Sequence, residues 1–341
     1  MQAAALARDY TDFVRESDVV EAPALVSLDD IRSAAGRIRG LVRRTPVLDI
    51  PVAEFAGREP SSAQSLSLKC ECFQPGGAFK IRGACNMIAQ LPPESRRAGV
   101  ITYSSGNHGR AVALVAEAFQ APAVVVMPET TPRVKVEGVR RHGAEVVFAG
   151  TTSADRKVQA EKLSKTRGLT IVPPFDHPWI IAGQGTTGLE ILEQCSQARV
   201  VYVPVGGGGQ IAGIGAAVKG MRSAVRVVGV EPVGAARMTA SLAAGRPVTL
   251  ESSASIADGL LTLRAGDLTF AHVKAFVDAV VIVTDEEIAA AVKWLFHAAK
   301  VVAEPSGATA VAAALRALEP GTVAVVSGGN VDPDAFAGYI R

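Results

Sequence analysis

The segment Val203-Pro204-Val205-Gly206-Gly207-Gly208-Gly209-Gln210 consists of an apolar stretch followed by four glycines. Mostly small apolar residues follow it, over residues 211–219. The apolar stretch predicts a buried strand, and the residues after the glycines predict a helix. Glycine lets the backbone approach a ligand with its amides pointing toward it, and a helix start adds partial positive charge. The segment therefore predicts a phosphate-binding loop.

The loop alone leaves its ligand open. Gly207, Gly209 and Ala212 fit the spacing of a dinucleotide-binding fingerprint, and Glu231 follows about 20 residues later, where a ribose-binding acid is expected. A nicotinamide-dependent oxidoreductase is therefore one interpretation. A flexible glycine turn without any ligand is another.

Composition and charge indicate an enzyme-sized protein that acts on small molecules. The chain has 341 residues, of which 48% are hydrophobic, so it is long enough for a large core and two lobes. The net charge is +2 and no basic stripe stands out, which argues against nucleic-acid and anionic-membrane partners. No apolar run approaches the length of a membrane span, and residues 3–7 are too short for a signal sequence. We expect a cytoplasmic location.

The four cysteines show neither metal-ligand spacing nor the density of a secreted disulfide scaffold. We interpret them as buried thiols; they are Cys70, Cys72, Cys85 and Cys195.

Hydrophobic periodicity predicts a mostly parallel, doubly wound α/β architecture. Ser27 and Asp30 form a capping-box pattern before a helix that Gly40 can stop, and alternation over residues 66–72 predicts a half-buried strand. From residue 100 onward, short apolar runs alternate with helical patterns; the runs cover 100–103, 123–127, 145–148, 169–172, 200–205, 226–230, 279–283 and 323–326. We expect two lobes: a large cofactor-binding domain of residues 27–92 and 174–341, a small domain of residues 93–173, and an N-terminal extension over residues 1–26.

Three further loops lie at strand-to-helix junctions, where open α/β sheets place functional groups. They are Gly77-Ala78-Phe79-Lys80-Ile81-Arg82-Gly83, Ser104-Ser105-Gly106-Asn107-His108-Gly109 and Ser327-Gly328-Gly329-Asn330. Four further motifs are Pro173-Pro174-Phe175-Asp176-His177-Pro178, Ile181-Ala182-Gly183-Gln184-Gly185-Thr186, Ala257-Asp258-Gly259 and Glu304-Pro305-Ser306. Together with the glycine loop and these four motifs, the three loops make the chain resemble the fold-type II pyridoxal-phosphate enzymes. Within these tryptophan synthase β-like proteins it resembles the threonine and serine dehydratases and the serine racemases.

The resemblance implies pyridoxal 5'-phosphate as cofactor and assigns residues to it. Lys80 is similar to the Schiff-base lysine, and apolar Phe79 beside it disfavours the charged amine. The loop of Gly206, Gly207, Gly208 and Gly209 then holds the phosphate, Asn107 bonds the ring hydroxyl, and Ser327 is the partner of the pyridine nitrogen. The alternatives are a solvated helix lysine and turn residues that bond only their own backbone.

The resemblance also implies a substrate site at the start of the second of these loops. Ser104, Ser105, Gly106, Asn107 and His108 suit capture of a substrate carboxylate by hydroxyls and free amides. The two serines alternatively serve as plain helix caps. Arg156 matches an arginine near the substrate in the racemases, and an ordinary surface arginine is the alternative.

The implied reaction is elimination of water from L-threonine or L-serine, which gives a 2-oxo acid and ammonia. Pro173-Pro174-Phe175 resembles the dehydratases at that point. Racemisation by Lys80 and Ser105 on opposite faces of the cofactor is the main alternative, and a non-catalytic amino-acid-binding relative is another. The chain ends soon after the Ser327 loop, so we expect no regulatory domain and no feedback inhibition by isoleucine; a homodimer is the family expectation.

Two positions depart from the family pattern. Relatives commonly carry hydroxyl residues where this chain has Gly76 and Ala78, so polar contacts near the cofactor are lost, which bears on the substrate more than on the cofactor. In the divalent-activated relatives a cation is bound at positions that here are Glu231, Ala235 and Arg237. Because a guanidinium replaces a carboxylate ligand, we expect no divalent metal site, with Arg237 either paired with Glu231 or exposed to solvent beside a weak monovalent cation.

Overall fold

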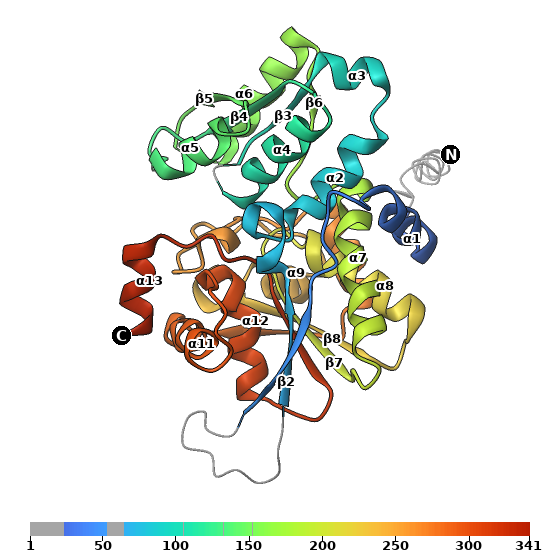
Figure 1. Ribbon diagram of the computed structural model, residues 1–341, viewed down its shortest axis with the longest axis vertical. Coiled ribbons are helices and arrows are strands. Elements are labelled where there is room, and N and C mark those ends of the chain that lie inside the picture. Colours follow the sequence, from blue (N-terminus) through green and yellow to red (C-terminus); the bar gives the residue numbers. More distant parts are fainter. Residues whose placement is uncertain (1–23, 53–64, 105, 132, 152) are drawn as a thin grey trace, which may run out of the picture.

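The computed structural model describes residues 24–52, 65–104, 106–131, 133–151 and 153–341. Ser105 and most of the expected N-terminal extension lie outside this described part. Two sheets, one above the other in Figure 1, are covered by helices on both sides, which confirms the doubly wound α/β architecture.

The larger sheet has the strand order β1-β2-β10-β7-β8-β9 within the described residues. Its strands are β1 (Val47–Pro51), β2 (Ser65–Cys70), β7 (Val200–Pro204), β8 (Arg226–Pro232), β9 (Ala279–Val283) and β10 (Thr322–Val326). β1 pairs antiparallel with β2, and all other neighbours pair in parallel. The carboxyl ends of β2, β7 and β10 therefore lie at the same edge, and the loops that follow these strands converge there.

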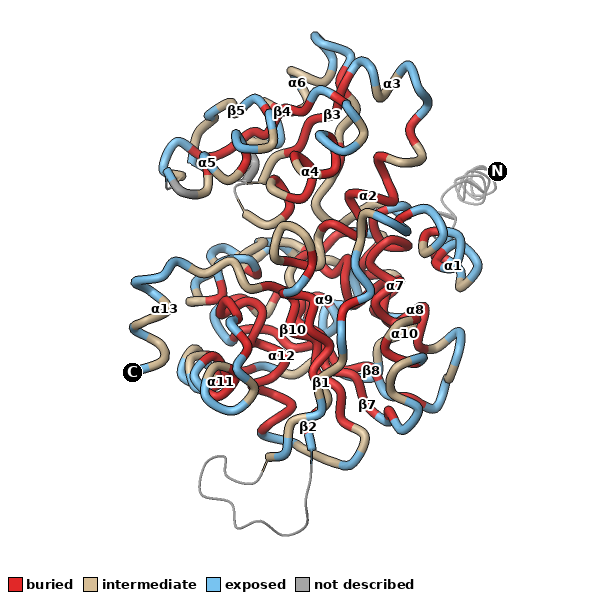
Figure 2. Tube along the Cα trace, viewed as in Figure 1, coloured by how far each residue is buried: buried red, intermediate tan, exposed pale blue. Residues whose placement is uncertain are grey.

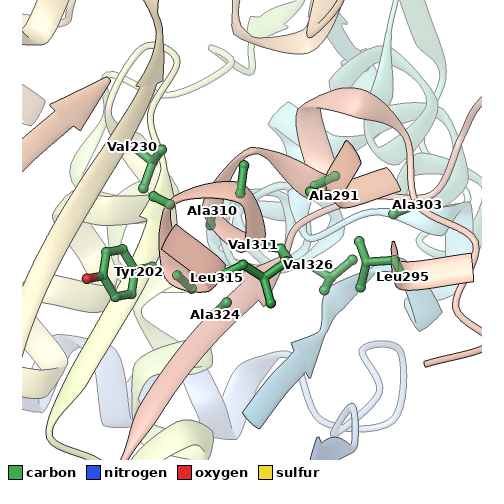
Figure 3. Close-up of a cluster of buried hydrophobic side chains, with 14 of the residues drawn as sticks. Tyr202, Val230, Ala291, Leu295, Ala303, Ala310, Val311, Leu315, Ala324 and Val326 are labelled. Atoms are coloured by element: carbon green, nitrogen blue, oxygen red, sulfur yellow. The ribbon is translucent and has the colours of Figure 1, made fainter. Parts of the chain in front are cut away.

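Alternate residues of these strands build two cores, one on each face of the larger sheet. Val201 and Val203 pack with α7 (Pro178–Gln194), α8 (Gly209–Met221) and α10 (Asp267–Phe276). Tyr202 and its neighbours pack on the other face with α11 (Asp285–His297) and α12 (Pro305–Arg316), as Figure 3 shows. Because both faces are covered, the strands read as continuous apolar runs.

The smaller sheet is parallel throughout, in the order β5-β4-β3-β6. It consists of β3 (Val100–Thr102), β4 (Ala123–Met127), β5 (Glu145–Phe148) and β6 (Thr170–Ile171), with α3 (Pro93–Ala98), α4 (Asn107–Ala118), α5 (Arg133–Arg140) and α6 (Ser153–Arg167). All four strands lie between residues 93 and 173, and the exact domain boundaries stay a prediction. α2 (Lys80–Gln90) lies at the junction of the two sheets in Figure 1.

The prediction of the first helix is confirmed at the start of the helix and is corrected at its end. Ser27 and Asp30 form the expected capping box of α1 (Leu28–Arg37), but the helix ends before Gly40. The remaining elements are α9 (Arg237–Ala244), α13 (Pro333–Ile340) and short 3₁₀ turns η1 (Glu71–Phe73), η2 (Pro75–Gly77), η3 (Val233–Ala235) and η4 (Asp258–Leu260).

The strand expected over residues 66–72 is present as β2, but it ends at Cys70 and the expectation that one face is exposed is wrong. Lys69 and Glu71, expected on the polar face, are both 0% exposed. α7 covers that face and brings Glu190 within 2.6 Å of the Lys69 ammonium. In Figure 2, α7 and α8 are drawn mostly as buried, beside the larger sheet. Among the cysteines, Cys70, Cys72 and Cys85 are buried as expected and Cys195 is half-buried, and all four are free thiols.

Candidate active site

Lys80 begins α2 and faces the segment that enters α7. Its ammonium donates a hydrogen bond of 2.7 Å to the carbonyl oxygen of Pro174 and lies 5.1 Å from the centre of the Phe79 ring. Removal from water disfavours the charged amine, and this burial lowers the pKa of Lys80 to about 8. A lysine with such a pKa supplies free amine near neutral pH, as a nucleophile or a base requires.

The glycine loop connects β7 to α8. Gly208 has a φ of 95° and forms the N-cap of α8, a backbone conformation that favours glycine. A Cβ atom on Gly207 would lie 2.3 Å from the ring of Phe175, so the ring and the loop are in close contact. The Thr269 hydroxyl donates a hydrogen bond of 2.7 Å to the Gly207 carbonyl and so fixes the loop from α10.

The loop has the donors that a phosphate needs. Within the described residues, the backbone amides of Gly206, Gly207, Gly208 and Gly209 donate no hydrogen bond. The first intrahelical bond of α8 runs from the Ala212 amide to the Gly208 carbonyl. Free amides at a helix N-terminus form an anion site, because the helix dipole adds to their partial charges.

Asn107 bonds to distant side chains instead of its own backbone. Its amide nitrogen donates a hydrogen bond of 2.6 Å to Glu304, and its amide oxygen accepts one of 2.8 Å from Asn330. Burial, aided by the negative charge of Asp258, raises the pKa of Glu304 to about 8. The start of α4, the N-cap of α12 and the loop after β10 therefore meet at Asn107.

The Ser327 loop lies directly beside the lysine loop. The Phe79 amide donates a hydrogen bond of 3.0 Å to the Ser327 carbonyl, and Ala78 pairs with Gly328 in an antiparallel bridge. The Ser327 hydroxyl is buried and makes one long hydrogen bond of 3.4 Å, to the Ser306 carbonyl. A hydroxyl held this weakly is available to a ring nitrogen.

The expected substrate loop forms the start of α4. Gly106 is its N-cap and donates a hydrogen bond of 3.4 Å to the Ser104 hydroxyl. His108 is buried and bonds the Val172 carbonyl at 3.0 Å; burial and the positive charge of Lys80 lower its pKa to about 3. His108 is therefore neutral at physiological pH, and Ser105 lies outside the described residues.

Arg156 lies on α6, which covers the smaller sheet. The residue is half-buried, and burial lowers its pKa. This placement decides neither for a substrate contact nor for the surface arginine of the alternative. Its contact with a substrate stays a prediction.

Glu231 does not serve as a ribose-binding acid. It is 0% exposed, and its two oxygens accept hydrogen bonds from the Met238 and Thr239 amides and from the Thr239 hydroxyl at 2.8–2.9 Å. These contacts cap α9. The nicotinamide interpretation therefore lacks the acid on which it depended.

Arg237 points into the protein toward Glu231. Its Nε lies 3.8 Å from Oε1 of Glu231, and its terminal nitrogens donate hydrogen bonds to the carbonyls of Val205 and Ala235. The residue is 0% exposed, which removes the expectation that its side chain reaches solvent. A guanidinium thus lies among two carbonyls and a carboxylate directly behind the glycine loop.

Several site residues were not assigned a role from the sequence. They are Pro174, Phe175, Thr269, Glu304 and Asn330. Four of them stand in the motifs on which the family resemblance rests, so that resemblance could have identified them as site residues. These four are Pro174, Phe175, Glu304 and Asn330. Thr269 stands in none of these motifs.

The residues present fit pyridoxal 5'-phosphate. An amine of lowered pKa, four free loop amides and a weakly bonded serine hydroxyl come from three loops at one sheet edge. The amine matches the aldehyde of the cofactor, the loop amides match its phosphate, and the serine hydroxyl matches its ring nitrogen.

Comparisons with known proteins agree with this fit. The family described as pyridoxal-phosphate dependent enzyme matches residues 38–328. An L-threonine ammonia-lyase of Thermotoga maritima is 42% identical over 312 residues, which cover 90% of this chain and 76% of that protein. A serine racemase of Oryza sativa subsp. indica is 39% identical over 315 residues, which cover 89% of this chain and 91% of that protein.

A solved structure has the same fold. The structure of maize serine racemase has a TM-score of 0.86 and 38% sequence identity to this chain, with 92% of this chain and 97% of that one covered. The chain belongs to the fold-type II pyridoxal-phosphate dependent enzymes, in the group of the threonine ammonia-lyases and serine racemases, and pyridoxal phosphate is its cofactor.

Proposed function

We propose that this enzyme eliminates water from a β-hydroxy amino acid, L-threonine or L-serine. The resulting enamine tautomerises to an imine, which water hydrolyses to a 2-oxo acid and ammonia. The observation that carries the proposal is the Lys80 amine, whose pKa is lowered to about 8 at the edge where the cofactor loops converge. An L-threonine ammonia-lyase at 42% identity supports the same reaction.

In the proposed reaction, Lys80 removes the Cα proton of the substrate. The pKa of its amine, about 8, is close enough to neutral pH for the amine to accept a proton. The Pro174 carbonyl, 2.7 Å away, stabilises the ammonium that results. When bound, pyridoxal phosphate supplies the electron sink that makes the Cα proton acidic.

Ser327 favours elimination in this proposal. A neutral hydroxyl does not hold a proton on the pyridine nitrogen as a carboxylate does, so the sink is weak and prompt loss of a β-leaving group is favoured. Glu304 orients Asn107 toward the position proposed for the ring hydroxyl.

The substrate carboxylate is proposed to bind at the start of α4. Ser104, Gly106, Asn107 and His108 provide a hydroxyl and backbone amides there, and the helix dipole favours an anion. We propose Ser105 as a second hydroxyl for the carboxylate. His108 is neutral, so it adds no positive charge. We propose Arg156 as a further contact from the smaller sheet.

We also propose a homodimer in the cytoplasm, with the domain division at residues 92/93 and 173/174. None of the helices among the described residues is long and apolar enough to cross a membrane.

Serine racemisation is the second candidate, because a serine racemase is 39% identical over nearly the same span. In that case Lys80 and Ser105 act on opposite faces of the cofactor. The holoenzyme should be incubated with L-threonine and with L-serine, and both 2-oxo acid and D-serine should be measured by chiral chromatography. The proposal predicts 2-oxo acid as the main product. D-serine formed in excess over pyruvate would favour racemisation, and no turnover of either substrate would favour a binding protein.

A further inference from the structure

A buried network of charges lies beneath the start of α2. Arg82, two residues after Lys80, forms hydrogen bonds of 2.7–2.8 Å to both oxygens of Glu71 and to both oxygens of Glu190. Arg82 and Glu71 are 0% exposed, and the Glu190 side chain is 14% exposed. One guanidinium therefore joins α2 to the end of β2 and to α7.

The network is balanced in charge and in hydrogen bonds. Thr186 accepts a further bond of 3.0 Å from Arg82, so every N–H group of the guanidinium has an acceptor. Lys69 adds a second positive charge and binds Glu190 at 2.6 Å. Burial raises the pKa of Glu71, but the positive charge of Arg82 and its hydrogen bonds outweigh burial and lower it overall.

Backbone hydrogen bonds also hold the first turn of α2: the Phe79 amide donates to the Ser327 carbonyl, and the Gly83 amide donates to the Gln184 side chain. Its N-cap, Phe79, makes no side-chain capping hydrogen bond. Gly83 lies against α7, where a Cβ atom would be 2.4 Å from the Gln184 amide, so the two helices are in direct contact at the level of Arg82. Arg82 adds the charged side-chain hydrogen bonds that tie this turn to Glu71 and Glu190.

Helix geometry couples Arg82 to Lys80. Residues two apart on an α-helix project about 200° apart, so Lys80 faces the cofactor loops while Arg82 faces the interior. A rotation of α2 by roughly 10° moves a lysine amine by more than about 1 Å, because the amine lies far from the helix axis. Misplacement of a reacting group by about 1 Å can lower a rate by about 100-fold.

We propose that Arg82 is a positioning residue for the reaction: by clamping Glu71 and Glu190 it fixes the rotation of α2 and thereby the place of the Lys80 amine. The proposal rests on the proposed role of Lys80 as the cofactor-binding lysine. It assigns a task to a charge network that contacts neither substrate nor cofactor.

The test compares Arg82→Lys with Lys69→Met. Arg82→Lys keeps the charge but loses the planar fork that holds both carboxylates. Lys69→Met disturbs the same network from β2, where Lys69 binds Thr45, Glu190 and Gln194 and makes no bond to α2. We expect both variants to lower the melting temperature, which is measured for each, so that a change in the properties of Lys80 found in Arg82→Lys alone is distinguished from general destabilisation.

Two quantities separate positioning from stability. The first is the pH midpoint of the rate at which added pyridoxal phosphate forms its coloured adduct with Lys80 in full-length protein stripped of cofactor. The second is kcat against KM in the holoenzyme. For Arg82→Lys we expect the midpoint to rise by at least about one unit, because a loosened Lys80 is more hydrated, and kcat to fall at least about tenfold with little change in KM. For Lys69→Met the pH midpoint should not change, and kcat and KM should stay within about twofold of wild type.

Equal effects in the two variants, or an unchanged midpoint and kcat in Arg82→Lys, would overturn the proposal. If Arg82→Lys does not fold, the double variant Arg82→Gln/Glu71→Gln removes one charge of each sign and carries the same expectations. A wild-type protein that forms no adduct with pyridoxal phosphate would refute the role of Lys80 itself, which is a different outcome.

Discussion

The Lys80 ammonium donates a hydrogen bond of 2.7 Å to the Pro174 carbonyl, which lies in the segment between β6 and α7. The next residue, Phe175, lies against Gly207 of the phosphate loop. One short segment therefore contacts both the lysine and the phosphate loop. Changes on either side of this segment should alter cofactor binding before they alter the fold.

The contact between Gly207 and Phe175 predicts a strong effect of Gly207→Ala. The added Cβ atom would lie 2.3 Å from the ring, so the ring or the loop must move, which costs about 1–3 kcal/mol. We expect the dissociation constant for pyridoxal phosphate, measured by titration of tryptophan fluorescence, to rise at least about tenfold. Gly36→Ala is the matched control, because no atom lies within 4 Å of the added Cβ; unchanged affinity in both variants would contradict the assignment of the loop.

The lowered pKa of Lys80 predicts a pH dependence of stability. In the unfolded chain the group titrates near 10.5 and in the folded chain near 8, because burial disfavours the charge. Between pH 8 and pH 10.5 the unfolded chain binds more protons, so the free energy of unfolding contributed by Lys80 rises with pH. Below pH 8 the charge destabilises the folded state in full.

Urea unfolding of cofactor-free wild type and Lys80→Met across that range measures this contribution. At pH 7 the free energy of unfolding should be lower for wild type than for the variant. This difference should shrink as the pH rises. A stability difference that does not change with pH would show that Lys80 is not desolvated.

Ser105→Ala distinguishes elimination from racemisation. If Ser105 only helps to hold the substrate carboxylate, its loss should weaken elimination by the value of one hydrogen bond to a charged group, ~1.5–3 kcal/mol, measured in kcat/KM for 2-oxo acid formation. If Ser105 is the acid and base on the opposite face, D-serine formation should vanish while elimination of L-serine survives. Wild-type enzyme that forms no D-serine from L-serine excludes racemisation of that substrate.

The Arg237 guanidinium predicts activity without a divalent ion. It lies 3.8 Å from Glu231 and donates to the Val205 carbonyl next to the glycine loop, so a positive charge already lies beside this carboxylate. Wild-type activity should survive EDTA and gain nothing from Mg²⁺ or Ca²⁺. Severalfold stimulation of chelated wild type by Mg²⁺ would show that this expectation is wrong.

Arg237→Asp and Arg237→Met extend this test. The aspartate places a second carboxylate beside Glu231, so activity should become dependent on a divalent ion. Arg237→Met breaks the ion pair without adding a ligand. It should cost about 3–5 kcal/mol of stability in thermal unfolding and should not be rescued by Mg²⁺.

Local patterns predicted those parts of the site that are continuous in sequence. The glycine loop follows a strand that an apolar run located, and β4, β5 and β9 have the expected bounds. β1 was missed because Asp49 and Pro51 interrupt its apolar pattern. Its antiparallel pairing with β2 was therefore also missed.

Contacts between distant residues could not be predicted in this way. Asn107 and Glu304 are 197 positions apart, and nothing in either motif specifies that their side chains bond. Lys69 shows the same limit, because alternation identified its strand but placed it on a solvated face. The carboxylate that allows it to be buried comes from Glu190, 121 residues later.

The identity of the cofactor-bearing lysine is tested most directly by reduction of the holoenzyme with borohydride, followed by peptide mass spectrometry. The account predicts a pyridoxyl group on the peptide that contains Lys80. It also predicts that Lys80→Ala, which stays folded because one partly exposed lysine contributes little to the core, has neither the adduct nor 2-oxo acid production. A pyridoxyl group on another lysine, or full 2-oxo acid production by Lys80→Ala, would contradict it.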